Sequence, residues 1–254
     1  MTQENTLTRK ELELYGFTGS RYGLSSSTLK LFAVITMLID HSAGSVLWAI
    51  MDRLRLHGEF AAYNQLLPVY QAMRSIGRLA FPVFCFLIVE GFFHTRSVRK
   101  YCLRLFLFAL LSEFPFDLAL KPSPVYFGKQ NVYWTLLLSL IVIWVMDEMK
   151  ERPWIQGLAA VSGMMIARAM MTDYNYKGVF LIVVLYLFHD FRLYQAFGGA
   201  AAIAWEKMAP LSFILCFLYN GKRGWKMKYF FYIFYPGHLL LLGMIRYWAV
   251  PRFF

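Results

Sequence analysis

Residues 29–44 read Leu-Lys-Leu-Phe-Ala-Val-Ile-Thr-Met-Leu-Ile-Asp-His-Ser-Ala-Gly, and this stretch decides the fold class. The apolar run around it extends over about 28–50. A helix needs about 20 mostly apolar residues to cross the roughly 30 Å hydrocarbon core of a bilayer. The stretch therefore predicts a transmembrane helix that carries an acid and an imidazole past its middle.

Eight further apolar runs follow the first one along the chain. They lie near 69–94, 100–120, 131–149, 154–171, 178–189, 192–205, 208–220 and 228–249. The three runs within 178–220 are short and joined by tight connections, so this region permits thin helices, a re-entrant pair or a different division. The sequence predicts an all-α, polytopic transmembrane helical bundle of about nine spans, with eight to ten allowed by that region.

The composition agrees with a membrane bundle. Of the 254 residues, 59% are hydrophobic and 19% aromatic, whereas soluble domains are about 45–50% apolar. Charged residues make up only 16% and cluster between the apolar runs. No repeat, domain boundary or secretory signal is visible, so we expect a cytoplasmic polar tail at 1–26 and a single transmembrane domain at 27–254.

The net charge of +11 does not indicate nucleic acid as a partner. The basic residues lie in short segments that flank the apolar runs, as in the cytoplasmic loops of membrane proteins. Such clusters bind anionic lipid headgroups, so we expect membrane lipids as partners. A cytoplasmic N-terminus places the two densest basic segments, 94–104 and 220–228, on the inner side of the membrane.

Ionisable side chains inside the apolar runs are the candidate functional residues, because charges at membrane depth are costly and face a cavity or a partner. Asp40 and His41 are adjacent on a helix, so their side chains point about 100° apart and do not face each other. A carboxylate from another helix could orient the imidazole of His41. The alternative is a structural pair that joins two helices.

Other runs carry ionisable groups at similar depth. Arg78 lies in the second run, and Glu113 and Asp117 lie four residues apart on one helical face with Pro115 between them. Two like charges at this spacing indicate a cation partner, or a proton held on one of the carboxylates. Asn131 opens the next run.

Two more segments hold candidate residues. The 168–178 segment carries Arg168, Asp173, Tyr174 and Lys177 and is either a charged cluster at a membrane edge or a solvated loop. Near the C-terminal run, Lys222 and Arg223 could bind a phosphate from the cytoplasmic side, although ordinary loop topology explains them equally well. His238 is a second histidine deep in an apolar run, which indicates a site.

Five stretches resemble the TraX family in the expected order. They are the run already quoted at 29–41, Ile-Gly-Arg-Leu-Ala-Phe-Pro-Val-Phe-Cys-Phe-Leu-Ile-Val-Glu-Gly-Phe at 76–92, Leu-Leu-Ser-Glu-Phe-Pro-Phe-Asp at 110–117, Tyr-Asn-Gly-Lys-Arg-Gly at 219–224 and Phe-Tyr-Pro-Gly-His at 234–238. TraX proteins acetylate the N-terminal amine of conjugative pilin. The family is distantly similar to transmembrane acyltransferases such as heparan-α-glucosaminide N-acetyltransferase, which use cytoplasmic acetyl-CoA and an intramembrane histidine.

The resemblance implies an acetyl-CoA-dependent N- or O-acetyltransferase in the bacterial inner membrane. It implies that His41 is the reactive imidazole, either as a general base or as a transient acetyl carrier. The expected catalytic residues are His41, Asp40, Glu113 and Asp117. The expected residues for binding acetyl-CoA, the donor substrate, are Arg78, Asn131, Lys222, Arg223 and His238.

The acceptor and the assembly state stay open at this point. A peptide amine such as that of pilin, an envelope glycan and a lipid headgroup are all compatible with the sequence, as is a homo-oligomer. No metal is expected, because no HExxH or paired CxxC spacing occurs. The competing functions are an ion- or proton-coupled transporter, which also uses buried charges on broken helices, and a scaffolding protein.

Overall fold

The computed structural model describes residues 22–226 and 228–253, and this part of the chain contains helices and no β-strand. Each predicted apolar run coincides with one or more helices in the same order, so the all-α prediction is confirmed. The expected tail at 1–26 lies largely outside the described residues. Its last part, at Leu24, donates a backbone hydrogen bond of 2.7 Å to Leu218.

The first predicted run continues as one helical rod. It consists of α2 (Ser26–Ser42), a π-helical turn η1 (Ala43–Leu47) and α3 (Trp48–Leu56). Ser25 caps the start, because its side chain accepts from the backbone N–H of Thr28. The π-helical turn begins two residues after His41, and such turns occur often at functional sites.

The second run divides at Arg78 and Leu79 into α4 (Phe60–Gly77) and α5 (Ala80–His94). By length and composition, the joined helices 26–56 and 60–94 are the two in the described residues that could cross a membrane. The remaining helices are α6 (Val98–Leu120), α7 (Val132–Glu148), α8 (Pro153–Ala169), α9 (Asn175–Leu187), α10 (Arg192–Ala202), η2 (Ala209–Leu211), α11 (Ser212–Phe217), α12 (Lys228–Met244), η3 (Ile245–Ala249) and α13 (Val250–Phe253).

The ambiguous 178–220 region contains helices of 13, 11 and 6 residues, α9, α10 and α11. Each is shorter than the roughly 20 residues that a perpendicular crossing requires, so nine full spans stay a prediction. Helices α10 and α11 pack against each other and against α9 and α5, respectively. The hydroxyl of Ser212 donates a 2.9 Å hydrogen bond to the carbonyl of Leu79, which ties the start of α11 to the division between α4 and α5.

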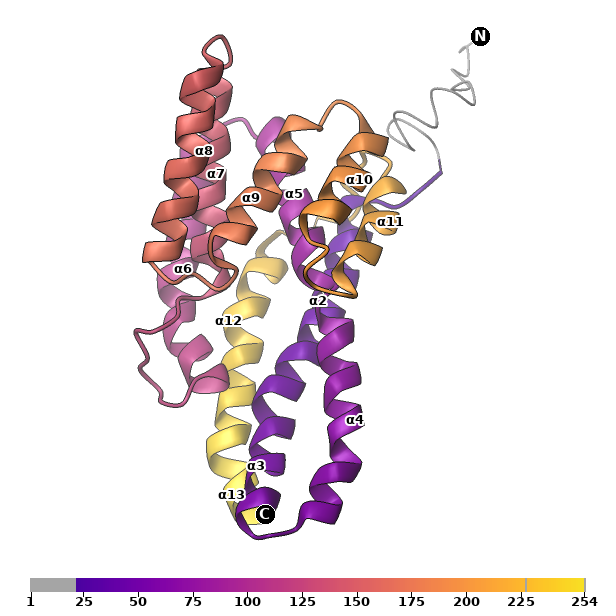
Figure 1. The fold of residues 1–254 in the computed structure, drawn as a ribbon, viewed down its shortest axis with the longest axis vertical. Helices are drawn as coiled ribbons and strands as arrows, with labels where there is room; N and C mark the ends of the chain where they lie inside the picture. Colours follow the sequence, from indigo (N-terminus) through magenta and orange to yellow (C-terminus); the bar gives the residue numbers. More distant parts are fainter. Residues whose placement is uncertain (1–21, 227, 254) are drawn as a thin grey trace.

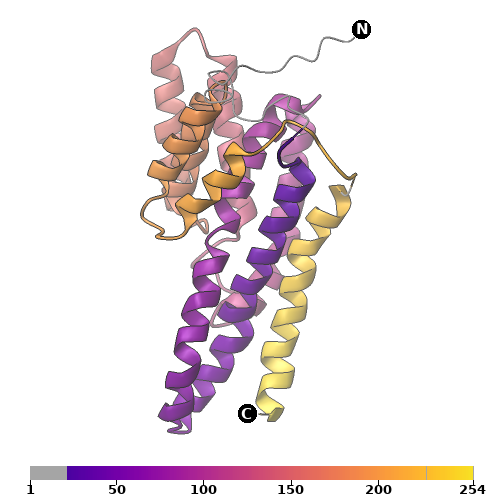
Figure 2. The same ribbon diagram turned by 90° about the vertical axis from the view of Figure 1, so that its right-hand side faces the viewer.

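The arrangement is elongated (Figures 1 and 2). The rod of 26–56, helix α4 and the rod of 228–253 run side by side and extend below the other helices in both views. From α5 to α10, successive helices alternate in direction. The α5–α6, α7–α8 and α9–α10 connections therefore lie in the upper part of Figure 1, and the α6–α7 and α8–α9 connections lie lower.

Helix α6 presents an apolar stripe to the outside. Its exposed large side chains recur at spacings of three and four residues, which places them on one face; they are Leu103, Phe106, Leu107, Leu110, Leu111 and Phe114. A contiguous exposed apolar face of this kind marks contact with a partner or a membrane. Together with the two long apolar helices at 26–56 and 60–94, this face indicates association with a membrane.

Candidate functional site

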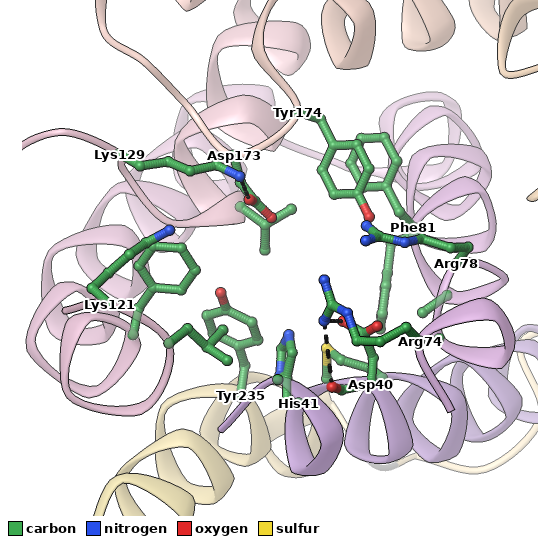
Figure 3. Close-up of a pocket in the computed structure, with 18 of the residues that line it drawn as sticks. Asp40, His41, Arg74, Arg78, Phe81, Lys121, Lys129, Asp173, Tyr174 and Tyr235 are labelled. Atoms are coloured by element: carbon green, nitrogen blue, oxygen red, sulfur yellow. Dashed lines mark hydrogen bonds and ion pairs between the residues drawn. The ribbon is translucent and has the colours of Figure 1, made fainter. Parts of the chain in front are cut away.

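A cavity of about 360 Å³ lies where α2, the end of α4, the end of α6, the start of α7 and α12 meet. Figure 3 shows polar side chains pointing into it from several elements. The ionisable residues that line it are Asp40, His41, Tyr70, Arg74, Arg78, Lys121, Lys129, Asp173, Tyr174 and Tyr235. Five of these, Asp40, His41, Arg78, Asp173 and Tyr174, were candidate residues in the sequence.

Asp40 pairs with Arg74 across the contact between α2 and α4. The Asp40 Oδ2 atom lies 2.8 Å from Nη1 of Arg74, and both side chains are largely shielded from solvent. Gly77 makes this approach possible, because a Cβ atom at that position would overlap the Cβ and carboxylate of Asp40. The carboxylate is therefore committed to the α2–α4 contact.

His41 is bonded to a second histidine. Its Nδ1 lies 2.7 Å from Nε2 of His238, and the two rings are parallel within 3°. His238 Nδ1 lies 2.6 Å from the carbonyl oxygen of Phe234. A carbonyl only accepts, so Nδ1 of His238 carries the proton and donates. In a neutral His238, Nε2 is then an acceptor, and Nδ1 of His41 must donate to it.

This chain of donors fixes the tautomer of neutral His41. With its proton on Nδ1, the Nε2 atom holds a lone pair, and the ring projects into the cavity (Figure 3). The partner of His41 is thus an imidazole from α12 and not one of the carboxylates expected to be catalytic, Asp40, Glu113 and Asp117. Helix packing caused the difference, because it turns Asp40 towards α4 and His41 towards α12.

The opposite wall of the cavity combines a cation with aromatic rings. Nε of Arg78 lies 3.5 Å from Oε2 of Glu206, and its guanidinium is beside the hydroxyl of Tyr174. The Tyr174 ring stacks on Phe81 with centroids 3.4 Å apart. Burial raises the pKa of Tyr174, so its hydroxyl keeps its proton and can donate a hydrogen bond.

Two lysines complete the lining. Nζ of Lys129 lies 2.7 Å from Oδ1 of Asp173, and Nζ of Lys121 lies 4.6 Å from the ring centroid of Phe116. Burial lowers the pKa of Lys121, and the charge of Lys129 lowers it further. The 168–178 segment therefore contributes Asp173 and Tyr174 to the cavity.

Glu113 and Asn131 form a separate network between α6 and α7. A single carboxylate oxygen, Oε1 of Glu113, accepts from the backbone N–H of Asn131 at 3.1 Å, from its Nδ2 at 2.7 Å and from Nε1 of Trp134 at 2.6 Å. Asn131 also caps α7, because its side chain accepts from the N–H of Tyr133 at 3.0 Å. Neither Glu113 nor Asn131 lines the cavity.

Asp117 supports the loop between α6 and α7. Its Oδ2 accepts from the backbone N–H of Tyr126 at 2.8 Å, which fixes the middle of the 121–131 segment. Lys121 and Lys129 lie near the two ends of that segment. Asp117 therefore acts on the cavity indirectly, through the loop that carries both lysines.

Lys222 and Arg223 lie at the other end of α2. Their carbonyls accept from the backbone N–H groups of Ser26 and Ser27, at 2.8 and 3.1 Å. Fifteen residues separate Ser26 from His41, or about 22 Å along a helix. Neither side chain lines the cavity, so the structure separates these predicted donor-binding residues from Asp40, His41 and Arg78.

Sequence reasoning missed three charged cavity residues, Arg74, Lys121 and Lys129. Arg74 had a detectable signal, because it lies four residues, about one helical turn, before Arg78. The two lysines had none, since they flank a loop whose path depends on Asp117. The described residues contain no group of three or more histidine, cysteine or acidic side chains that could hold a metal ion.

Comparisons with known proteins agree with the resemblance seen in the sequence. A protein-family model with the description "TraX protein" matches residues 25–246. A curated protein of Dichelobacter nodosus, described as "Probable fimbrial assembly protein FimC, serogroup H1", is 28% identical over 249 residues, which covers 86% of this chain and 94% of that protein. No solved structure gives a significant match.

Proposed function

Because this chain belongs to the TraX protein family, we propose that it is a membrane acetyltransferase that modifies a pilus or envelope component. The donor is acetyl-CoA, and the acceptor is an amine or hydroxyl, foremost the N-terminal amine of a pilin-like subunit. The observation that carries the proposal is the 2.7 Å contact between His41 and His238, which leaves a lone pair on Nε2 of neutral His41 in a cavity beside two arginines. The name of the similar Dichelobacter protein, a probable fimbrial assembly protein, supports a pilus-related acceptor.

The chemistry needs one base and one site for negative charge. The acceptor nitrogen attacks the thioester carbonyl carbon, and His41 Nε2 removes a proton from that nitrogen. The carbon–sulfur bond then breaks, and the proton passes from His41 to the departing thiolate. The products are an acetylated amine and free CoA, so atoms and charges balance without another reactant.

Arg74 and Arg78 stabilise the oxygen that becomes negative during this attack. Both guanidinium groups line the cavity with His41 (Figure 3). Fixed cationic donors stabilise developing charge in a site shielded from water, and removing one such donor typically costs 10²–10³-fold in rate. Asp40 keeps Arg74 in place through the 2.8 Å ion pair.

In this proposal, the donor and the acceptor enter from opposite ends of the molecule. We propose that the basic connections, including Lys222 and Arg223, face the cytoplasm and hold the phosphates of acetyl-CoA. The cavity, with about 360 Å³, is at the small end of ligand pockets, so it holds the reacting ends of the substrates. The pantetheine arm would then extend along α2 to His41, and the acceptor would enter from the far side of a multi-pass bundle in the inner membrane.

The experiment uses the full chain, purified and placed in lipid nanodiscs. Isotope-labelled acetyl-CoA and a synthetic peptide with a free N-terminal amine are added, and mass spectrometry measures the gain of one acetyl group. A parallel binding measurement compares acetyl-CoA with a sample that lacks it. Binding and transfer support the proposal, whereas a chain that neither binds acetyl-CoA nor modifies an acceptor contradicts it and favours transport.

A further inference from the structure

A second cavity adjoins the first one at Lys121. It measures about 370 Å³ and is lined by Trp48, Asp52, Leu120, Lys121, Pro122 and Arg246. Trp48, Leu120 and Lys121 belong to both cavities. Lys121 therefore lies at the junction between the cavity that holds His41 and a space that continues along α3 and the C-terminal rod.

The loop that carries Lys121 and Lys129 is fixed at several points. Asp117 binds the N–H of Tyr126, and the N–H of Gln130 donates a 3.0 Å hydrogen bond to the carbonyl of Met171. Pro122 also restricts the backbone beside Lys121. Both lysine ammonium groups consequently point into the cavity from the same side (Figure 3).

The charges around the cavity do not cancel. Four cationic side chains line it, against two carboxylates. Each carboxylate has its own partner, since Asp40 pairs with Arg74 and Asp173 with Lys129. Arg78 is next to Glu206. Within the described residues, Lys121 is the lining cation that forms no ion pair. Its ammonium group lies over the aromatic ring of Phe116.

We propose that Lys121, with Lys129 beside it, forms a subsite for an anionic group, a carboxylate or a phosphate, on a substrate whose reacting atom lies at His41. The proposal rests on the function above in taking this cavity as the place of acyl transfer. The charge excess also assists an amine acceptor, because nearby cations disfavour its protonated form and leave the nucleophilic free amine. The anion belongs either to the acceptor or to the thioester donor. In the second case the donor phosphates lie at Lys121 and not at Lys222 and Arg223.

Binding of inorganic phosphate and of acetate tests the subsite without any need for catalysis. The full chain in nanodiscs is titrated with each salt, and the thermal unfolding midpoint is followed. We expect a saturable rise for the native chain and an apparent Kd at least about tenfold weaker in Lys121→Gln, because charge-assisted hydrogen bonds are lost. Lys121→Arg should keep the binding.

Lys177→Gln is the matched control. Lys177 also lies over an aromatic ring, 4.2 Å from the centroid of Trp205, but it does not line the cavity. This variant should bind phosphate like the native chain. An identical response of Lys121→Gln and Lys177→Gln, or the lack of any saturable response in the native chain, would overturn the subsite.

Kinetic measurements identify the source of the anion. If the acceptor supplies it, Lys121→Gln raises the KM for an acidic acceptor peptide and leaves the KM for acetyl-CoA unchanged; if the donor supplies it, the reverse holds. Either result supports the subsite, and no change in either KM contradicts it. A chain that binds phosphate through Lys121 but transfers no acetyl group contradicts only the proposed function.

Discussion

His41 and His238 lie 197 residues apart in sequence, yet Nδ1 of the first is 2.7 Å from Nε2 of the second. The carbonyl of Phe234 accepts a hydrogen bond from Nδ1 of His238. This bond places the proton of each neutral imidazole on Nδ1. The arrangement is that of a base and a second group that orients it. His238 holds His41 with its lone pair at the cavity, and this relationship supports the first two predictions.

Replacement of His41 by alanine is expected to reduce acetyl transfer by about 10²–10⁴-fold, the usual contribution of a general base. The protein should still fold and insert, because the His41 side chain borders a cavity. Labelled acetyl transfer measures the rate, and gel filtration with thermal unfolding checks the fold. Full activity in His41→Ala would refute the mechanism.

His238→Phe removes the acceptor for Nδ1 of His41 while keeping an aromatic ring of similar shape. Loss of the correct tautomer is costly in enzymes that depend on a histidine base, and we expect the rate of acetyl transfer to fall on the order of 10²-fold or more. Nitrogen-15 NMR of labelled histidines should show His41 protonated at Nδ1 in the native chain and mixed tautomers in the variant. Tyr235→Phe, at a neighbouring position of the cavity, serves as the control and should leave the tautomer unchanged.

Gly77→Ala is expected to destabilise the protein, because the added Cβ overlaps Asp40. Overpacking of this kind typically costs about 1–3 kcal/mol, and the ion pair between Asp40 and Arg74 should break. Gly157→Ala is the matched control, since nothing lies within 4 Å of a Cβ there and alanine favours a helix. Thermal unfolding midpoints compare the two variants. An equal shift in both would contradict the close contact between Gly77 and Asp40.

Glu113→Ala should lower stability rather than catalysis. The change leaves three donors on Asn131 and Trp134 without their acceptor, and each unsatisfied buried group costs about 1–3 kcal/mol. Glu113→Gln retains a carbonyl oxygen as the acceptor and should lose much less stability. The unfolding midpoint and Trp134 fluorescence measure this. A large loss of turnover per folded molecule in Glu113→Gln would instead assign the carboxylate a catalytic role.

Phosphate binding at the Lys121 subsite should weaken with rising pH, and earlier than for an ordinary exposed lysine. Burial and the charge of Lys129 lower the pKa of Lys121, although Asp173, Asp117 and Glu113 act in the opposite direction. The ammonium is present below that lowered pKa and is lost as the pH rises through it, so the affinity falls there. Lys121→Arg keeps its charge throughout, and its phosphate affinity should not show this early fall.

The sequence determined the positions of the helices and the family. Apolar runs of suitable length are a local property of the chain, and each one became helical, from α2 at Ser26–Ser42 to α12 at Lys228–Met244. The Asp40–His41 pair could also be selected, because ionisable residues within apolar runs stand out. The lengths of the helices within 178–220 could not be predicted, because short apolar runs do not specify where one helix ends and the next begins.

Tertiary structure alone decided which side chains meet. Helical periodicity gives the face of each residue on its own helix, but the partner depends on how neighbouring helices are rotated and how far they are shifted. The sequence therefore left the partner of His41 open, and packing supplied His238 in place of a carboxylate. It likewise paired Asp40 with Arg74 and joined Glu113 to Asn131 away from the cavity. Lys121 and Lys129 entered the site through a loop, whose path no periodicity encodes.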